Sequence, residues 1–412
     1  MGGTVQQRSV VRVGASLIVA SLALTACGSR NDDSGDGGSG STTKTAKIGV
    51  IAPLSGDLSA LGLGIQHSVE LAVKQANDAN AIPGWKLEVV PQDDEQKPDV
   101  GKNAATTLSS DADVIGVVGT LNTDVSQQVQ PILAPKNIVQ VSPANTGPGL
   151  TMGAKWQTAP QRPYPTYFRT CTTDAVQGPF AARYLFNSGI KKVATIHDKR
   201  AYGQGLVGTF TDEFKKLGGT IVAAETINPD DSNYTAVVSA VKPSAPEAVY
   251  YGGQYPEAGP LSQQMKAAGL TVPLMGGDGI YDGKYITLAG KNSNNDLATS
   301  VGAPVESLPS AKKFVEDYAA AKYPDPFAAY GGYSYDAANA IINALKVSLK
   351  DAADVTSARP ATVAAMKDVS FDGVTGKVAF DEFGDTTSKV LTTYKVTAGK
   401  WVAVKTEDFA AK

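Results

Sequence analysis

The 412-residue chain contains few residues of the types that most often carry catalysis or bind metals. Its only histidines are His67 and His197, and its only cysteines are Cys27 and Cys171. Two histidines cannot build a multi-histidine metal cage, and the G-x-S-x-G, Walker and H-E-x-x-H motifs are all missing. His197 follows a predicted strand and could act as a base, although a structural role is the simpler interpretation. We therefore expect no metal, no cofactor and no catalytic residue.

An excess of positive charge is also missing, as are long apolar runs. Without residues 1–26, which carry Arg8 and Arg12 and no acid, the chain has 35 Lys plus Arg against 40 Asp plus Glu, a formal charge of −5. A mildly acidic surface argues against nucleic acid as a partner. The apolar run "VGASLIVASLALTA" falls short of the roughly 20 residues that a membrane-spanning helix needs. It is typical of the core of a signal peptide.

The residue after this run is Cys27. Together with Leu24, Thr25 and Ala26 it resembles a bacterial lipobox, in which the cysteine sulfur is acylated. An ordinary cleaved signal peptide with an incidental cysteine is the alternative. We predict a lipoprotein signal peptide over residues 1–26 and a flexible, Gly- and Ser-rich tether over 27–45, because such a segment cannot bury enough apolar surface to become ordered. With Cys27 acylated, Cys171 has no partner for an internal disulfide.

From residue 47 onward, short β-branched runs alternate with longer helical patterns. The first series begins with "KIGVIA" and ends with "IVQVS"; after the Pro-rich passage 156–170, a second series runs from "KVATIHD" to "VPLMGG". Continuous apolar strands separated by amphipathic helices predict parallel-type sheets covered on both faces. Two such series predict two Rossmann-like α/β lobes. Because open parallel sheets bind ligands beyond the carboxyl ends of their strands, a cleft between the lobes is the expected site.

Polar residues follow two strands of the first series. They are Thr120, Asn122 and Thr123 in "VVGTLNTDVSQQ" and Ser142, Asn145 and Thr146 in "VSPANTGPGL". Free backbone N–H groups at the start of a helix attract an anion such as a carboxylate. The alternative for the first stretch is a simple capped helix, since Asp124 and Gln127 have capping-box spacing. Two polar strand ends beside each other favour the anion site.

In the second series, Tyr202 and Asp278 follow strands. Asp278, in "MGGDGI", could hold an ammonium group, with Tyr202 as a hydrogen-bond acceptor or an aromatic lid. The alternative is a turn, because Asp beside Gly is common in turns.

Several stretches, in this order, resemble the branched-chain amino-acid substrate-binding proteins of ABC transporters, the leucine/isoleucine/valine-binding type. The stretches are "VSPANTGPGLT", "FRTCTTDAVQGPFAARYL", "IHDKRAYGQGL", "AVYYGGQYPEAG", "AAGLTVPLMGGDGI" and "YGGYSYDAANA". The resemblance covers about residues 45–395 and implies the type I periplasmic-binding fold, a venus flytrap with a three-segment hinge. The implied hinge crossings lie near 168–171, 301–304 and 379–385. The implied lobes are 46–169 plus 303–380 and 170–302 plus 381–412.

The resemblance also assigns roles to the polar strand ends. It implies that Thr123, Asn145 and Thr146, with Ser142 nearby, hold the ligand's α-carboxylate. Tyr202 and Asp278 match the groups that close on the α-ammonium.

This sequence departs from the family in the side-chain pocket. Gln254 stands where the family has a tyrosine, and Leu61 where it has an aromatic residue in the first loop; we expect both to contact the ligand's side chain. Gln96 and Asn122 stand at the positions of the family's first-lobe disulfide, in agreement with the cysteine count.

Together these features predict an extracytoplasmic, lipid-anchored solute receptor. We expect a monomer that binds a branched-chain or related amino acid and delivers it to the permease subunits of an ABC importer. Three alternatives stay open: a receptor for amides, urea or aromatic acids, a ligand sensor for a signalling partner, and a secreted enzyme with His197 or Asp278 as base.

Overall fold

The structure, a computed structural model, describes residues 43–409. Its first sheet has five parallel strands in the order β2-β1-β3-β4-β5. The strands are β1 (Lys44–Ala52), β2 (Trp85–Asp93), β3 (Val114–Gly119), β4 (Val139–Ser142) and β5 (Tyr167–Arg169). All residues of β3 and β4 are buried, as their continuous apolar runs predict for strands covered on both faces.

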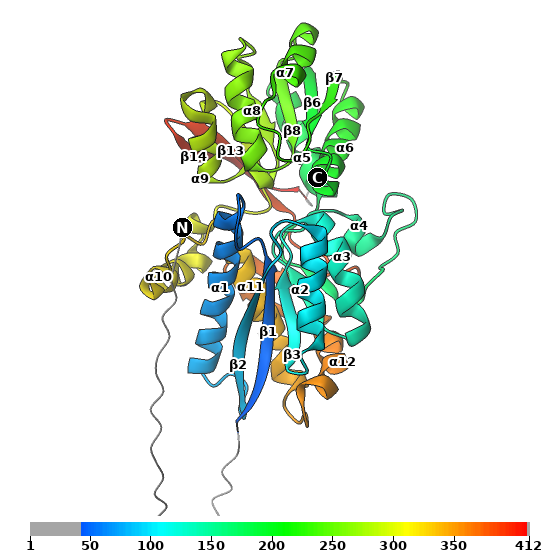
Figure 1. Ribbon diagram of the computed structural model, residues 1–412, viewed down its shortest axis with the longest axis vertical. Helices are drawn as coiled ribbons and strands as arrows, with labels where there is room; N and C mark the ends of the chain where they lie inside the picture. The colour runs from blue at the N-terminus through cyan, green and yellow to red at the C-terminus, as the bar shows by residue number, and fades with distance from the viewer. Residues whose placement is uncertain (1–42, 410–412) are drawn as a thin grey trace, which may run out of the picture. The chain divides into compact units, whose positions relative to one another are not determined.

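Helices from both ends of the sequence cover this sheet. They are α1 (Ser59–Asp78), α2 (Pro98–Ser110), α3 (Thr123–Leu133), α4 (Gly149–Met152), α10 (Lys312–Ala321), α11 (Gly331–Ser348) and α12 (Val355–Met366). Ile48 and Val50 of β1 join the core under α1 and α11, whereas Ile51 faces α2 and α3, because alternate residues of a strand point to opposite faces. In Figure 1, α11 lies beside α1 although it comes much later in the sequence. We call this sheet with its helices the first lobe.

The second sheet is mixed. Its order is β14-β13-β10-β9-β8-β6-β7. The strands are β6 (Lys192–His197), β7 (Thr220–Thr226), β8 (Ala248–Gly252), β9 (Leu274–Gly276), β10 (Leu297–Ser300), β13 (Val390–Thr397) and β14 (Lys400–Asp408). The strands from β6 to β10 pair in parallel, but β13 pairs antiparallel with both β10 and β14. The parallel-type sheet that the sequence predicts is therefore extended by an antiparallel edge.

The edge arises from a tight hairpin that the sequence analysis missed. Ala398 and Gly399 join β13 to β14 and both have positive φ, 50° and 75°. Two positive φ values at the centre of a two-residue loop are the geometry that fits the twist of antiparallel strands.

Helices also cover both faces of the second sheet. They are α5 (Asp174–Asn187), α6 (Ala201–Lys216), α7 (Thr235–Val241), α8 (Tyr255–Ala267) and α9 (Gly283–Ala289). Val193 and Tyr250 share a core with α5 and α6, while Ile196 and Tyr251 pack on the α7 and α8 side. We call this sheet with its helices the second lobe. A small hairpin, β11 (Ser370–Gly373) with β12 (Gly376–Ala379), hydrogen-bonds to Asp336 of α11.

The chain passes between the two sheets three times. It leaves the first sheet after β5, leaves the second after β10, and enters the second again at β13. The first and third passages are joined by a buried ion pair between Arg169 Nε and Asp385 Oδ1 at 2.6 Å, and by a backbone hydrogen bond from Arg169 to Gly384. Three passages agree with the number of crossings expected. The lobe boundaries and the hinge motion stay predictions.

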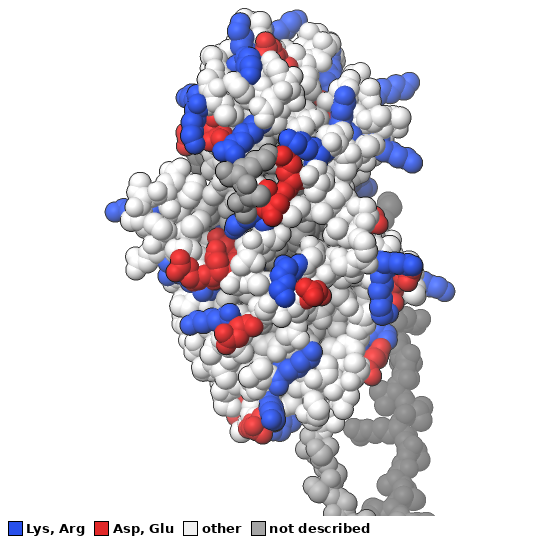
Figure 2. Space-filling view, turned by 180° about the vertical axis from the view of Figure 1, so that it is seen from behind, with Lys and Arg blue, Asp and Glu red and all other residues white. Residues whose placement is uncertain are grey.

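The predicted signal peptide (1–26), Cys27 and nearly all of the predicted tether lie outside the described residues. Among the helices of residues 43–409, none combines the length and the apolar character needed to cross a bilayer. Cys171 is buried, and it forms no disulfide within residues 43–409. On the face shown in Figure 2, Lys and Arg side chains are interspersed with Asp and Glu, and the described residues form no broad basic area there.

Candidate ligand-binding site

The loop between β3 and α3 forms one wall of the candidate site. Gly119 has φ 135°, and a Cβ there would lie 2.1 Å from the Ile51 carbonyl oxygen, so only glycine fits where the chain leaves β3. Helix α3 then begins at Thr123, with Asn122 as N-cap in extended conformation. No side chain caps the helix, and the Asn122 Oδ1 is buried without a hydrogen-bond partner. The N-cap side chain thus supplies no acceptor to the positive end of α3, which begins beside the site.

The capping-box alternative is wrong. Asp124 lies inside the first turn of α3, and its Oδ1 accepts only the N–H of the next residue, Val125, at 3.1 Å. The helix begins two residues earlier than the Asp124–Gln127 spacing suggests, because Asn122 and not Asp124 takes the extended N-cap conformation.

The second polar strand end supports this wall from behind. Ser142 Oγ donates to the Thr120 carbonyl and accepts the Asn145 N–H, both at 2.8 Å. Asn145 Nδ2 donates to the Leu121 carbonyl at 2.8 Å. These hydrogen bonds hold the two loops together. Neither Ser142 nor Asn145 lines the cavity described below.

Thr146 faces the second lobe. Its carbonyl accepts the N–H of Asp174, the first residue of α5, at 2.8 Å. Its hydroxyl and the Oδ2 of Asp174 are both buried without a hydrogen-bond partner. Arg169 fixes this loop by donating from Nη1 to the carbonyls of Asn145 at 2.7 Å and Gly147 at 3.0 Å.

Asp278 forms the opposite wall. It begins the short 3-10 helix that follows β9, and it is 3% exposed. Its carboxylate accepts hydrogen bonds from Gln177 Nε2 at 2.9 Å, Tyr202 OH at 2.8 Å and Tyr330 OH at 2.8 Å. Burial raises the pKa of Asp278, and these hydrogen bonds act against the rise. All three donors are neutral, so the carboxylate has no cationic partner among the described residues.

Tyr202 reaches Asp278 because α6 starts close to β8. The helix begins at Ala201, earlier than the sequence pattern suggests, so Tyr202 lies in its first turn. A Cβ on the neighbouring Gly203 would lie 2.3 Å from the Gly252 carbonyl oxygen, so the glycine permits this approach. The Tyr202 hydroxyl also accepts the Gly279 N–H at 3.1 Å.

Gln177 and Asp174 extend the buried polar group beneath Asp278. Gln177 Nε2 is also 3.1 Å from Asp174 Oδ1, and its Oε1 accepts the Asp278 N–H and the Thr299 hydroxyl. Burial, with a smaller contribution from the charge of Asp278, raises the pKa of Asp174 to about 8. Asp174 is therefore mostly protonated at neutral pH, so it adds little negative charge to this wall.

A small cavity separates the two walls. It is lined by Leu121, Asn122, Thr123, Ala144, Tyr202, Gln254, Asp278, Gly279 and Tyr330. Its volume of about 10 Å³ holds roughly one water molecule, so a larger ligand requires the walls to move apart.

Contacts between the lobes hold the walls together. Gln96 Nε2 donates to Gln254 Oε1, Tyr255 OH donates to the Asp57 carbonyl, and Tyr330 OH reaches Asp278. Gln96 has φ 61°, in the left-handed region. Opening the cavity breaks all three hydrogen bonds.

Four of the eight predicted ligand contacts line the cavity: Thr123, Tyr202, Gln254 and Asp278. Ser142, Asn145 and Thr146 do not line it, and Leu61 is packed in the core of the first lobe with 1% exposure. The sequence analysis did not single out Tyr330, Gln177 or Asp174. Their only signal was membership of two of the quoted stretches, "YGGYSYDAANA" and "FRTCTTDAVQGPFAARYL".

His67 and His197 lie elsewhere. His67 is stacked on Tyr323 with ring centroids 4.6 Å apart, and His197 Nδ1 accepts the Lys199 N–H at 3.1 Å. Burial lowers the pKa of His197. Neither histidine lines the cavity.

Comparison with known proteins agrees with this geometry. The family model described as periplasmic binding protein matches residues 45–400. The Leu/Ile/Val-binding protein homolog 3 of Brucella melitensis biotype 1 is 31% identical over 87% of this chain and 93% of its own length.

Two solved structures have the same fold over nearly their whole length. The branched-chain amino acid transporter substrate binding protein LivJ from Streptococcus pneumoniae, in complex with isoleucine, is 27% identical with a TM-score of 0.77 over 89% of this chain and all of the other. A solute binding protein of R. palustris in complex with benzoate is 22% identical, with a TM-score of 0.76 over 88% of this chain and 96% of the other, which is a likeness of fold alone. The chain therefore belongs to the periplasmic binding protein family and is a relative of its Leu/Ile/Val-binding members.

Proposed function

We propose that this protein is the receptor of an ABC importer and binds a branched-chain or related amino acid between its lobes. The observation that carries the proposal is the opposite polarity of the two walls. The uncapped, positive end of α3 faces a buried carboxylate, Asp278, across one cavity. A zwitterion matches this arrangement, since each of its charges meets a partner when it is removed from water.

In this proposal the α-carboxylate is held by the first-turn N–H groups of α3 and by the side chains of Asn122 and Thr123. The α-ammonium is held by Asp278 and the hydroxyl of Tyr202. Ser142, Asn145 and Thr146 act mainly by shaping the loops, unless opening of the cavity exposes them. Leu61 would contact the ligand only after the core beside it rearranges.

The preference for a branched-chain side chain is supported by the relatives. The Brucella relative is named as a Leu/Ile/Val-binding protein, and LivJ was solved with isoleucine. In this proposal the ligand side chain contacts Gln254 and Tyr330, which also line the cavity. A micromolar dissociation constant, about −8 kcal/mol, is within reach of two paired charges and a modest apolar group.

Location is the second part of the proposal. Periplasmic binding proteins act outside the cytoplasm, and we propose that acylated Cys27 and the tether hold this one, as a monomer, at the outer face of the cell membrane. Two or more acyl chains suffice for stable anchoring. Closure about the ligand then presents it to the permease, and no covalent bond is made or broken.

An aromatic-acid receptor is the second candidate. It is favoured by Gln254 in place of an aromatic residue and by the burial of Asp278, which raises the pKa of this carboxyl. A protonated Asp278 would tolerate a ligand without an ammonium group. The benzoate-bound relative shows that the fold accepts such ligands.

Native mass spectrometry of the freshly purified protein, followed by a thermal-shift panel, separates the candidates. An amino acid that co-purifies and raises the unfolding temperature supports the first. Benzoate or an amide that does so while amino acids do not supports the second. Chromatography of the released ligand tests whether it is returned unchanged, as a receptor requires and an enzyme does not. A pull-down against membrane proteins distinguishes an ABC permease from a signalling partner.

A further inference from the structure

A second cavity lies beside the passage from β10 to α10 and shares no lining residue with the cavity at Asp278. Its volume is about 170 Å³, and elements of both lobes line it. A cavity of roughly 150 Å³ is enough to hold benzene. The space therefore suits a molecule with one ring or a compact group of similar size.

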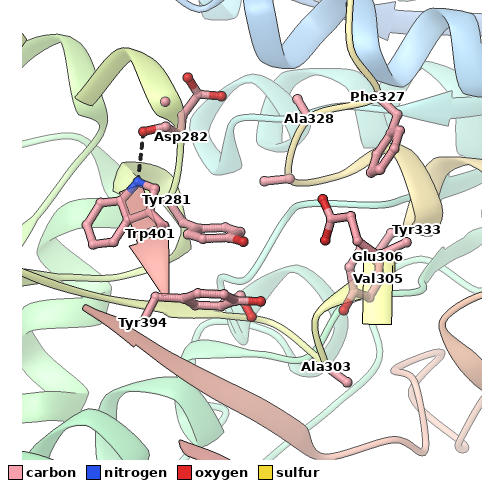
Figure 3. Close-up of a pocket in the computed structure, with 13 residues that line it drawn as sticks. Tyr281, Asp282, Ala303, Val305, Glu306, Phe327, Ala328, Tyr333, Tyr394 and Trp401 are labelled. Atoms are coloured by element: carbon pink, nitrogen blue, oxygen red, sulfur yellow. Dashed lines mark hydrogen bonds between the residues drawn. The ribbon is translucent and has the colours of Figure 1, made fainter. Parts of the chain in front are cut away.

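Aromatic rings form its walls (Figure 3). Tyr281 and Tyr394 are stacked with centroids 4.0 Å apart, and Trp401 lies 6.0 Å from Tyr281. Figure 3 shows these rings on one side of the space, with Phe327 and Tyr333 on the other. The faces of such rings attract a cation that is removed from water, whereas their edges do not.

One unpaired carboxylate faces this space. In Figure 3 the Glu306 carboxylate points toward the hydroxyl ends of Tyr281 and Tyr394. Glu306 is exposed and has no ion-pair partner within residues 43–409. The other acid, Asp282, has a structural role: its side chain accepts the Lys284 N–H, and its carbonyl accepts Trp401 Nε1 at 2.9 Å. No Lys, Arg or His is present among the described residues that line the cavity.

We propose that this cavity binds a small organic cation that carries no carboxylate, such as an aryl amine salt or a quaternary ammonium compound. The aromatic walls and Glu306 stabilise the positive charge, and the volume limits the size. A carboxylate on the ligand would be repelled by Glu306, and no basic side chain lines the cavity to pair with it. An amino acid is therefore disfavoured here. The inference rests on this cavity alone and does not depend on the proposed amino-acid site.

The test is a calorimetric titration of the mature protein with benzylamine, benzyl alcohol and benzoate, which share one ring and differ in charge. Benzylamine should bind at least tenfold more tightly than benzyl alcohol, and benzoate should not bind at this cavity. Tryptophan fluorescence should change on addition of benzylamine, and Trp401→Phe should remove that change because Trp401 lines the cavity.

Variants then locate the bound amine. Glu306→Gln should weaken benzylamine binding about tenfold, as expected for loss of one partly exposed charge partner. Glu316→Gln, an exposed acid on α10, is the matched control and should have no effect. Asp278→Asn should leave benzylamine binding unchanged. Equal binding of benzylamine and benzyl alcohol, an absence of benzylamine binding, or a loss caused by Asp278→Asn and not by Glu306→Gln would overturn the proposal.

Discussion

The hydroxyl of Tyr330 donates a hydrogen bond to Asp278 Oδ2 at 2.8 Å, and so joins the start of α11 in the first lobe to the loop after β9 in the second. It is one of few polar contacts across the cavity, and it ends on the group proposed to hold the ligand's ammonium. In the proposed function, closure of the lobes and recognition of the ligand therefore involve the same carboxylate.

Tyr330→Phe should weaken amino-acid binding roughly tenfold, or about 1.4 kcal/mol, because it removes one hydrogen bond to a charged group and leaves the ring in place. Calorimetry measures the change. Tyr335→Phe, on the same helix, removes a hydroxyl that donates to Gln75 away from the cavity, and it serves as control. Equal affinities for the two variants would show that Tyr330 does not contribute to the site.

Asp278→Asn should abolish measurable amino-acid binding, a loss of about 2 to 5 kcal/mol, since the ligand's ammonium would be buried beside a neutral group. Asp212→Asn, which changes an exposed acid on α6, should bind as the unmodified protein does. Circular dichroism checks that both variants are folded. A folded Asp278→Asn variant with unchanged affinity would remove this carboxylate from the site.

Asp174 should make the stability of the protein depend on pH. Its folded-state pKa of about 8 lies above the usual value of 3.8, so between these two pH values the folded state binds more protons than the unfolded state. The free energy of unfolding should then fall as pH rises through this window, by up to about 1.4 kcal/mol per pH unit from this group.

Asp174→Asn should reduce that slope, as measured by urea unfolding between pH 5 and 8. Asp94 and Asp198, whose pKa values burial raises to about 7, add slopes of the same sign, so the difference between the variant and the parent isolates Asp174. Identical slopes in the two proteins would contradict the buried, protonated state of this residue.

Arg169→Met should destabilise the protein by about 3 to 5 kcal/mol, because it leaves Asp385 buried without a partner and frees the carbonyls of Asn145 and Gly147. Lys74→Met breaks the exposed pair with Asp78 and should change stability by less than about 1 kcal/mol. Denaturant unfolding compares the two. A small effect of Arg169→Met would mean that the first and third passages between the lobes are not held by this ion pair.

Cys27→Ser should release the protein from the membrane fraction, whereas Cys171→Ser should not, because Cys171 is buried in the fold. Fractionation of cells and mass spectrometry of the mature N-terminus give the result. Retention of Cys27→Ser in the membrane would contradict the proposed anchor.

The sequence predicted the strands best where they are fully buried. The runs "DVIGVVG" and "EAVYYGG" became β3 and β8 because a central strand of a covered sheet has apolar residues on both faces. The exposed strand β14 was missed, since none of its residues is buried and its pairing depends on a turn at Ala398 and Gly399. The local sequence pattern cannot reveal the pairing of two strands when tertiary contacts decide that pairing.

The same limit applies to the site. Thr123 follows a strand of the first sheet and Asp278 a strand of the second, and the carboxyl ends of such strands are where open α/β sheets bind ligands. Gln177 lies on α5, which packs within the second lobe beside Asp278, whereas Tyr330 is the N-cap residue of α11, and only the packing of the first lobe on the second directs it to Asp278. Leu61 was predicted from the family's pattern alone, and the fold places it in the core.

Calorimetric titration of the mature protein with leucine, isocaproate and isopentylamine tests the opposed polarity of the two walls most directly. The three compounds share one side chain, but isocaproate lacks the ammonium and isopentylamine lacks the carboxylate. If α3 and Asp278 each hold one charge, leucine or a close relative should bind in the micromolar range, and each analogue should bind at least a hundredfold more weakly. Isocaproate binding as tightly as leucine, or no binding of any amino acid, would contradict a site built for a zwitterion.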